Sequence, residues 1–234
     1  MQFSSPLIPG TLLKRYKRFL ADVLLNTGES ITAACPNTGA MLGLNAPGSP
    51  VWLSRSDKET RKYPHTWELV EIDGKGLVGV NTGAPNKIVS EALRSGLLPE
   101  LAGYESLRNE VKYGHNSRID ILLQGGGPDC YVEVKNTHLF RTSGLVEFPD
   151  CVTERGRKHL RELANMVRDG HRAAMVYLVQ AGFPEACGLA ADLDPDYVEA
   201  LVAARKAGVE AFALCCKVTT TEITAVRAIP VLDP

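Results

Sequence analysis

The chain has 234 residues, of which 44% are hydrophobic and 23% charged, and its 26 basic and 27 acidic side chains give a net charge of -1. This composition excludes a predominantly disordered chain, and the balanced charge excludes a wholly basic, histone-like binder of nucleic acid. Apolar runs stay shorter than the roughly 18 residues that a membrane span requires, so we expect no membrane partner.

The first 80 residues are predicted to form short strands without a convincing helix. Turn signals rich in Asn, Pro and Gly separate these strands. Because an open sheet of five strands would leave exposed edges, we expect a small closed barrel of the OB or SH3-like kind. The predicted strands are 16–25, 30–35, 51–54, 67–72 and 77–80.

A cluster of four cations and two aromatic rings lies within six residues near the start of this barrel. On a barrel surface, cations bind phosphates and rings bind bases, so the cluster predicts nucleic-acid binding. The alternative is that the rings belong to the core and the cations to the solvated face. The predicted binding residues are Lys14, Arg15, Tyr16, Lys17 and Arg18.

The rest of the chain alternates helices and strands, which is typical of an α/β domain. Helical periodicity, caps and closing glycines predict three helices, and apolar runs between turn signals predict the strands. The helices are 85–94, 153–169 and 195–207, and the strands are 107–113, 118–123, 131–135, 173–179 and 209–215, with an edge strand at 223–226.

Two of these strands carry acidic residues among apolar ones. In strand 118–123, alternation of side chains places Ile119, Ile121 and Leu123 on one face and Asp120 on the other. In strand 131–135, the same alternation places Glu133 and Lys135 together. If the two strands pair, the two carboxylates converge with the lysine beside them.

Two converging carboxylates suit a hard divalent cation, Mg2+ or Mn2+, which prefers oxygen ligands. Such a cation polarises a phosphodiester, and a neighbouring lysine orients the attacking water and neutralises developing charge. Asp120, Glu133 and Lys135 are therefore the predicted catalytic residues. The alternative is the polar face of a half-exposed sheet.

The order of the elements favours the catalytic interpretation. Helix, three strands, helix and strand is the order of the PD-(D/E)xK nuclease core, with Asp120 on the second strand and Glu133 and Lys135 on the third. That core often has a glutamate on its first helix, so Glu91 is a third predicted metal ligand. An ordinary solvated position for Glu91 is the open alternative.

The helix at 153–169 follows the acidic strands and is basic. Residues 153–172 carry six basic and three acidic side chains. Cations just after the acidic strands are suited to hold a nucleic-acid backbone near the metal, although a solvated helix face shows the same pattern. Arg155 and Lys158 on this helix, with Arg118 on the preceding strand, complete the predicted nucleic-acid-binding residues.

The six cysteines form no CxxC pair and have no histidine at zinc-finger spacing. Cys215 and Cys216 are adjacent, and a disulfide between neighbours is strained. We therefore expect reduced thiols in a cytoplasmic protein. A catalytic role for Cys35 is the alternative, but the sequence shows no evident partner base.

Seven segments together resemble the sugar fermentation stimulation protein A (SfsA) family of bacteria and archaea, over essentially the whole chain. They are LIPG (7–10), RYKRFLAD (15–22), CPNTG (35–39), NSRID (116–120), VEVKN (132–136), FPD (148–150) and TERGRKHL (153–160). The resemblance implies an N-terminal OB-fold domain, residues 1–82, and a PD-(D/E)xK domain, residues 83–234. It also implies sequence-non-specific DNA binding and a regulatory role in sugar, particularly maltose, metabolism.

Two hypotheses therefore stand. The first is a sequence-non-specific DNA-binding protein. The second is a metal-dependent nuclease that cleaves DNA or RNA through Asp120, Glu133 and Lys135. The intact acidic pair favours the second, because two carboxylates repel phosphate unless a cation intervenes. The resemblance favours the first, and DNA binding ranks first because it is common to both hypotheses. The sequence leaves open whether the protein is an enzyme or a homodimer.

Overall fold

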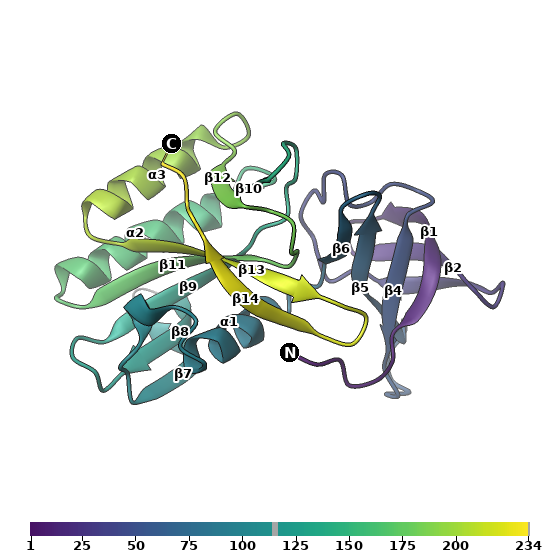
Figure 1. Ribbon diagram of the computed structural model, residues 1–234, viewed down its shortest axis with the longest axis horizontal. Coiled ribbons are helices and arrows are strands. Elements are labelled where there is room, and N and C mark those ends of the chain that lie inside the picture. The colour runs from purple at the N-terminus through teal and green to yellow at the C-terminus, as the bar shows by residue number, and fades with distance from the viewer. Residues whose placement is uncertain (114–116, 234) are drawn as a thin grey trace.

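The computed structural model describes residues 1–113 and 117–233. Figure 1 shows two sheets side by side, one built from the N-terminal strands and one from the rest of the chain. Asn116, the first residue of one family-like segment, lies outside the described residues. None of the helices in the described ranges is both long and apolar enough to cross a membrane.

The N-terminal strands form a closed barrel, as the sequence predicts. The pairing of Ala34 with Thr66 joins β3 to β5 and closes five strands on themselves, and β6 adds to the outside of β5. Trp67 and Leu12 are fully buried in the barrel core. In sheet order the strands are β3 (Ser30–Ala34), β2 (Leu20–Leu25), β1 (Ile8–Tyr16), β4 (Pro50–Arg55), β5 (His65–Ile72) and β6 (Gly76–Gly79).

One predicted strand is wrong. The segment 16–25 is not continuous, because the chain turns at residues 17–19 and Tyr16 pairs with Leu20 across a hairpin. Lys17 and Arg18 both have left-handed backbones, with φ of 50° and 64°. Asn and Gly usually occupy such positions, so this turn has no recognisable turn signal in the sequence. The strand before the turn, β1, is missing from the prediction for the same reason.

The second sheet has six strands and is covered on both faces. Strands β9, β11 and β13 are parallel, and the outer strands are antiparallel. Its predicted strands are confirmed. In sheet order they are β14 (Ile223–Ile229), β13 (Glu210–Val218), β11 (Arg172–Val179), β9 (Cys130–Asn136), β8 (Ser117–Gln124) and β7 (Ser106–Tyr113).

Helices cover this sheet as the apolar stripes require. Ile88 and Val89 of α1 (Pro85–Arg94) pack in a core with Val132 of β9, whereas Leu160 and Leu163 of α2 pack in the core of the opposite face. α2 (Glu154–Arg168) and α3 (Pro195–Lys206) lie together on that opposite face, as Figure 1 shows. The sequence did not predict the 3-10 turn Pro99–Leu101 or the small parallel sheet of β10 (Leu145–Phe148) and β12 (Ala186–Leu189).

Candidate functional site

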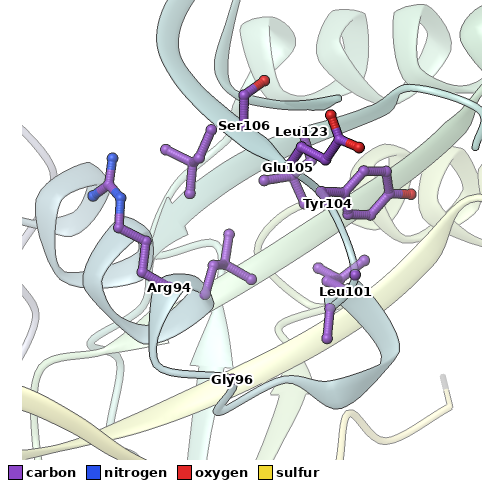
Figure 2. A pocket seen from close by; sticks show the side chains of 11 residues that line it. Arg94, Gly96, Leu101, Tyr104, Glu105, Ser106 and Leu123 are labelled. Carbon is purple, nitrogen blue, oxygen red and sulfur yellow. The ribbon is translucent and has the colours of Figure 1, made fainter. Parts of the chain in front are cut away.

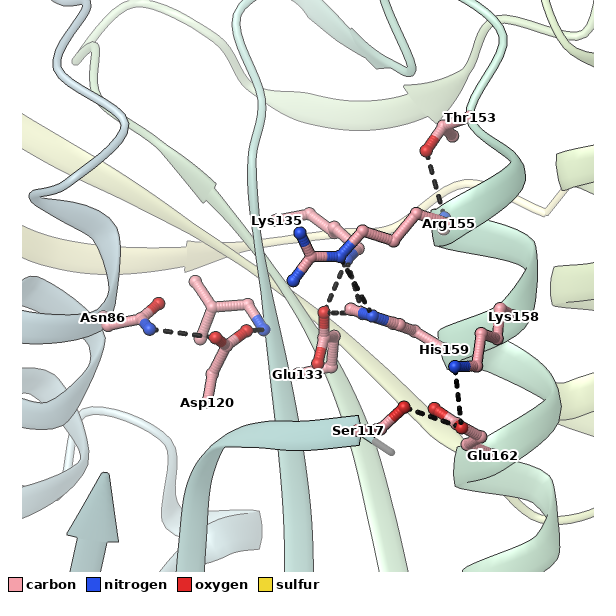
Figure 3. A network of polar contacts seen from close by, with 12 residues as sticks. Asn86, Ser117, Asp120, Glu133, Lys135, Thr153, Arg155, Lys158, His159 and Glu162 are labelled. Carbon is pink, nitrogen blue, oxygen red and sulfur yellow. Dashed lines mark hydrogen bonds and ion pairs between the residues drawn. The ribbon is translucent and has the colours of Figure 1, made fainter. Parts of the chain in front are cut away.

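Asp120 lies where β8 and β9 separate. The two strands pair only from Ile121 to Leu123, and beyond that point the Val134 amide donates to Asp120 Oδ2 at 2.8 Å. On the other side, Asn86 Nδ2 of α1 donates to Asp120 Oδ1 at 2.9 Å, as Figure 3 shows. Both carboxylate oxygens are therefore held, and the group has a fixed orientation at the opening between the strands.

The side-chain alternation predicted for β8 breaks at Asp120. Ile121 and Leu123 pack in the core on the α1 side, but Ile119 packs in the core on the α2 side. Opposite Asp120 in the register of β7 and β8, Glu110 has a left-handed backbone with φ of 55°. The prediction that Ile119 shares a face with Ile121 and Leu123 is therefore wrong, because this local distortion interrupts the regular pleat.

Glu133 and Lys135 leave β9 on the same face, toward α2. Lys135 Nζ donates to Glu133 Oε1 at 2.6 Å. His159 of α2 contacts the same carboxylate oxygen through Nδ1, which also lies 3.3 Å from Lys135 Nζ. The Glu133 side chain is only 3% exposed and that of Lys135 only 14%. This burial excludes the alternative of a solvent-facing polar sheet surface for these two residues.

The environment shifts the pKa values of the two carboxyls in opposite directions. Burial and, after it, the nearby charge of Glu133 raise the pKa of Asp120. The hydrogen bonds from the Val134 amide and Asn86 and the charge of Lys135 act in the opposite direction, but the net pKa is raised. Burial also acts to raise the pKa of Glu133, but the His159 hydrogen bond and the Lys135 charge outweigh it, so this pKa is lowered. Glu133 is thus the readily ionised member, and Asp120 is the one that an added cation would help to ionise.

The residues fit a hard divalent cation between Asp120 and Glu133. Glu133 Oε2 is buried and has no hydrogen-bond partner within the described part of the chain. Asp120 retains unused lone pairs, because each carboxylate oxygen accepts more than one bond. Across residues 1–113 and 117–233, no three His, Cys, Asp or Glu side chains gather into a metal-binding group. Two carboxylates with water or phosphate oxygens are a donor set that suits Mg2+.

The structure does not bring Glu91 to this site. Asn86 of α1 faces Asp120, and Glu91 follows five residues later, about 140° around the helix. Glu91 Oε2 instead lies 2.6 Å from the Met1 ammonium. The residue that sequence reasoning missed is Asn86, which bridges Asp120 and Glu110 with two 2.9 Å bonds. Its position one residue after the helix-opening proline is the available sequence signal, and it is a weak one.

A second polar layer lies beyond His159 along α2. Glu162 Oε1 accepts from Ser117 Oγ at 2.7 Å and lies 3.7 Å from Lys158 Nζ. Tyr113 is buried next to it, and burial followed by the charges of Glu133 and Glu162 raises the pKa of its hydroxyl strongly. Lys158 therefore reaches the edge of the site but is already paired, as Figure 3 shows.

Two other predicted nucleic-acid-binding residues lie close to the site. Arg155, exposed at the start of α2, has its Nε 3.4 Å from His159 Nε2 and so extends over the Glu133–Lys135 pair. Arg118, exposed on β8, is two residues from Asp120 and pairs across the strands with Lys112. Arg155 therefore lies beside the acidic pair, and Arg118 lies near Asp120 along β8.

The predicted cluster on the barrel divides into structural and exposed members. Arg15 Nη2 donates to the carbonyls of Arg18, Asn37 and Gly39 at 2.8 to 2.9 Å, so its guanidinium joins two loops. A second contact set joins Lys14 and Tyr16 to Asp22: Lys14 Nζ lies 3.4 Å from Oδ2, and the Tyr16 hydroxyl donates to Oδ1 at 3.0 Å. Lys17 and Arg18 remain as exposed cations at the tip of the hairpin.

A buried polar cluster fastens the barrel to the second sheet. Asp150 Oδ2 accepts from the Met41 amide at 3.0 Å and lies 3.3 Å from His138 Nε2. His138 Nε2 is in turn 3.5 Å from Asn37 Nδ2 in the loop that the sequence marks as CPNTG. A Cβ on Gly39 would stand 2.8 Å from Asp150 Oδ2, so a larger residue here would have to displace this carboxylate. This arrangement makes the CPNTG loop a domain contact, and the Cys35 thiol is buried within it.

Asp150 should make stability pH-dependent. Burial acts to raise its pKa, but the bond and charge of His138 and the Met41 amide lower it to about 2, against 3.8 normally. A depressed carboxyl pKa stabilises the fold above the unfolded pKa and loses that contribution as the pH falls through about 4 to 2. We expect the unfolding free energy of the wild type to fall about 2 kcal/mol more over this range than that of Asp150→Asn.

Urea titrations at pH 5, 4, 3 and 2 measure this difference. Asp73→Asn is the matched control, because Asp73 is exposed on a turn. Equal pH dependence for Asp150→Asn and the wild type would contradict the assignment of this ionic contact.

A separate recess lies on the α1 side of the second sheet. Figure 2 shows Arg94, Tyr104, Glu105 and Leu123 around it, and its volume is about 420 Å³. Its lining includes none of the predicted site residues. The candidate site around Asp120, Glu133 and Lys135 is therefore distinct from this recess.

Family models match both parts of the chain. Residues 83–222 match the sugar fermentation stimulation protein RE domain, and residues 13–80 match the SfsA N-terminal OB domain. The chain belongs to the sugar fermentation stimulation protein family. The five-stranded barrel is thus the OB domain of this family, and the predicted fold, an OB barrel followed by a restriction-endonuclease-like α/β domain, is confirmed.

Relatives cover the full chain. A homologue from Rhodospirillum centenum is 60% identical over 220 residues, 94% of each protein, and one from Brucella ovis is 55% identical over 234 residues, all of this chain and 98% of the relative. Among solved structures, Pyrococcus furiosus SfsA in complex with Ca2+ matches with a TM-score of 0.88 and 29% identity, covering 99% of this chain and 98% of that one.

Proposed function

We propose that this protein binds nucleic acid and hydrolyses its phosphodiester bonds with a divalent cation held by Asp120 and Glu133. The observation that carries the proposal is the acidic pair. Glu133 Oε2 is buried and has no partner among the described residues, and the charge of Glu133 lies close enough to Asp120 to raise its pKa. A polyanion is repelled by such a pair unless a cation intervenes. The pair is therefore better suited to a metal site than to a bare binding surface.

The side chains around the pair have distinct roles. A bound Mg2+ or Mn2+ would supply charge stabilisation at the phosphoryl oxygens. Asp120 is oriented by Val134 and Asn86, and Glu133 is kept ionised by His159. Lys135, whose ammonium lies 2.6 Å from Glu133, is positioned to orient the attacking water and to neutralise developing charge.

The overall organisation supports the same proposal. We assign residues 1–82 to an OB barrel that contributes nucleic-acid contacts and residues 83–234 to the hydrolytic domain. The Ca2+ in the Pyrococcus furiosus relative supports a site for a hard divalent cation, because Ca2+, Mg2+ and Mn2+ share a preference for oxygen ligands. DNA is the proposed substrate, with RNA as the second substrate to be tested.

A DNA-binding protein without turnover is the second candidate. It is favoured by the occupation of Glu133 Oε1 by both Lys135 and His159, which leaves one oxygen of that carboxylate for a cation. A regulatory role in sugar, particularly maltose, metabolism rests on the resemblance alone. We also keep a cytoplasmic location as a proposal and leave a homodimer as a question for sedimentation analysis.

The proposal predicts cleavage that depends on metal and binding that does not. Linear duplex DNA, circular DNA, single-stranded DNA and RNA are incubated with Mg2+, Mn2+ or EDTA, and products are resolved by electrophoresis. We expect cleavage of at least one substrate with Mg2+ or Mn2+, none in EDTA, and recovery when metal is restored. Binding in EDTA should weaken steeply with salt, because phosphate contacts release counterions.

For the cleavage assay and for the binding assay, one result each would contradict the proposal. Failure to cleave any substrate with either metal would exclude the nuclease and leave the second candidate. An affinity that does not change with salt would contradict binding through phosphates.

A further inference from the structure

The tip of the β1–β2 hairpin presents an aromatic ring directly after two cations in the chain. Phe19 is 51% exposed, although most large apolar side chains of the protein are buried. Lys17 and Arg18 precede it in a turn whose two left-handed residues are neither Gly nor Asn. Within the described ranges, no ion pair involves either cation. The tip therefore offers a free aromatic face and two free positive charges.

Hydrogen bonds join this tip to the CPNTG loop. Arg15 Nη2 donates to the Arg18 carbonyl at 2.8 Å and to the Gly39 carbonyl at 2.8 Å. Gly39 in turn lies so close to Asp150 that a Cβ on it would stand 2.8 Å from Oδ2. The Phe19 carbonyl also accepts from the Cys35 amide at 2.7 Å. These contacts lead from the hairpin tip through the CPNTG loop to Asp150.

Asp150 leads directly into the helix that carries the catalytic contacts. Val152, two residues later, is 67% exposed, and Leu42, next to the Met41 amide that binds Asp150, is 47% exposed. Thr153 caps α2 by accepting from the Gly156 amide. Arg155 in the first turn of α2 then contacts His159 beside Lys135. Asp150 and the helix whose His159 contacts Glu133 thus belong to one continuous segment, residues 150–168.

From this placement we infer that the hairpin tip binds unpaired nucleotides of a single-stranded segment, with Phe19 stacking on a base and Lys17 and Arg18 contacting phosphates. A duplex hides its base faces, so it would use only the cations, whereas exposed rings beside cations bind single strands by stacking and charge together. The inference rests on the proposed function, since it names the strand type of the nucleic acid that the protein is proposed to bind.

Binding of fluorescein-labelled oligonucleotides, measured by anisotropy in EDTA, tests this inference. Phe19→Ala should weaken binding of a single-stranded 15-mer about tenfold, about 1.4 kcal/mol, and leave binding of the matching duplex within about twofold. Phe19→Tyr should restore single-strand binding, because tyrosine keeps the aromatic face. Leu24→Ala is the matched control. Leu24 is a 38% exposed apolar residue on the same hairpin, but it lies four residues beyond Leu20, where β2 begins, and so away from the tip.

Two results would overturn the inference. One is an equal loss for single strand and duplex, and the other is an equal effect of Phe19→Ala and Leu24→Ala. Its failure is separable from failure of the proposed nuclease, because the binding assay contains no metal. If Phe19→Ala lost only single-strand binding and the wild type cleaved nothing, the role of the hairpin tip would be supported and the nuclease excluded. Metal-dependent cleavage with unchanged single-strand binding by Phe19→Ala would do the reverse.

Discussion

Replacing Asp120 by asparagine should reduce metal-dependent cleavage by about 10³-fold or more and leave nucleic-acid binding in EDTA unchanged or tighter. A cation held at the proposed site would contribute several kcal/mol of charge stabilisation, and each 1.36 kcal/mol corresponds to tenfold in rate. Asparagine keeps an oxygen that accepts from the Val134 amide but lacks the negative charge that a cation needs. The variant should therefore lose catalysis. It should keep or improve binding, because one fewer negative charge faces the phosphates.

Single-turnover cleavage rates and anisotropy binding, measured side by side, separate these effects. Glu110→Gln is the matched control, because Glu110 is an exposed carboxylate that accepts from the same Asn86 side chain at 2.9 Å. It should keep activity within a few-fold of the wild type. Cleavage by Asp120→Asn at wild-type rates, or equal losses in both variants, would remove Asp120 from the metal site.

Replacing Lys135 by methionine is the second large effect, and we expect cleavage to fall about 10²- to 10⁴-fold. Lys135 donates to Glu133 Oε1, and its side chain is only 14% exposed, so no solvent cation substitutes for it at low cost. Methionine fills similar space without the charge. Metal binding should persist or strengthen, because the variant no longer has an ammonium competing for the Glu133 carboxylate.

A Mn2+ titration by calorimetry beside the cleavage assay distinguishes the two roles of this lysine. Lys158→Met is the control, because Lys158 is 47% exposed and pairs with Glu162 one turn further along α2. Its effect should be limited to weaker nucleic-acid binding. If Lys135→Met lost Mn2+ binding in proportion to activity, Lys135 would be a support for the metal site and not a participant in hydrolysis.

On α1, the sequence predicted the helix but not its rotation about its own axis. Apolar spacing predicted this helix and its bounds, and the sequence pattern placed Glu91 among the metal ligands. The pattern did not indicate which polar position faces β8, because the rotation of the helix depends on how Ile88 and Val89 pack against the sheet. That packing directs Asn86 to Asp120 and Glu91 to the Met1 ammonium.

On strands β8 and β9, the sequence pattern likewise predicted side-chain directions only where the strand is regular. Alternation correctly separated Glu133 and Lys135 from Val132 and Val134 on β9, where the pleat is regular. Alternation gave the wrong face for Ile119, because β8 distorts at Asp120. There the Asp120 carboxylate, and not a backbone carbonyl, accepts from the Val134 amide. A single-strand pattern contains no information about where a neighbouring strand diverges.

The sequence by itself determined the two-part organisation, most strands and helices, the residue types of the site and the face shared by Glu133 and Lys135, since these depend on local periodicity and turn chemistry. Tertiary structure alone decided that His159 contacts Glu133, that Asn86 orients Asp120, and that the CPNTG loop meets Asp150. These contacts join segments distant in the chain. They form only when helices and loops dock on the sheet and water is excluded from the polar groups between them.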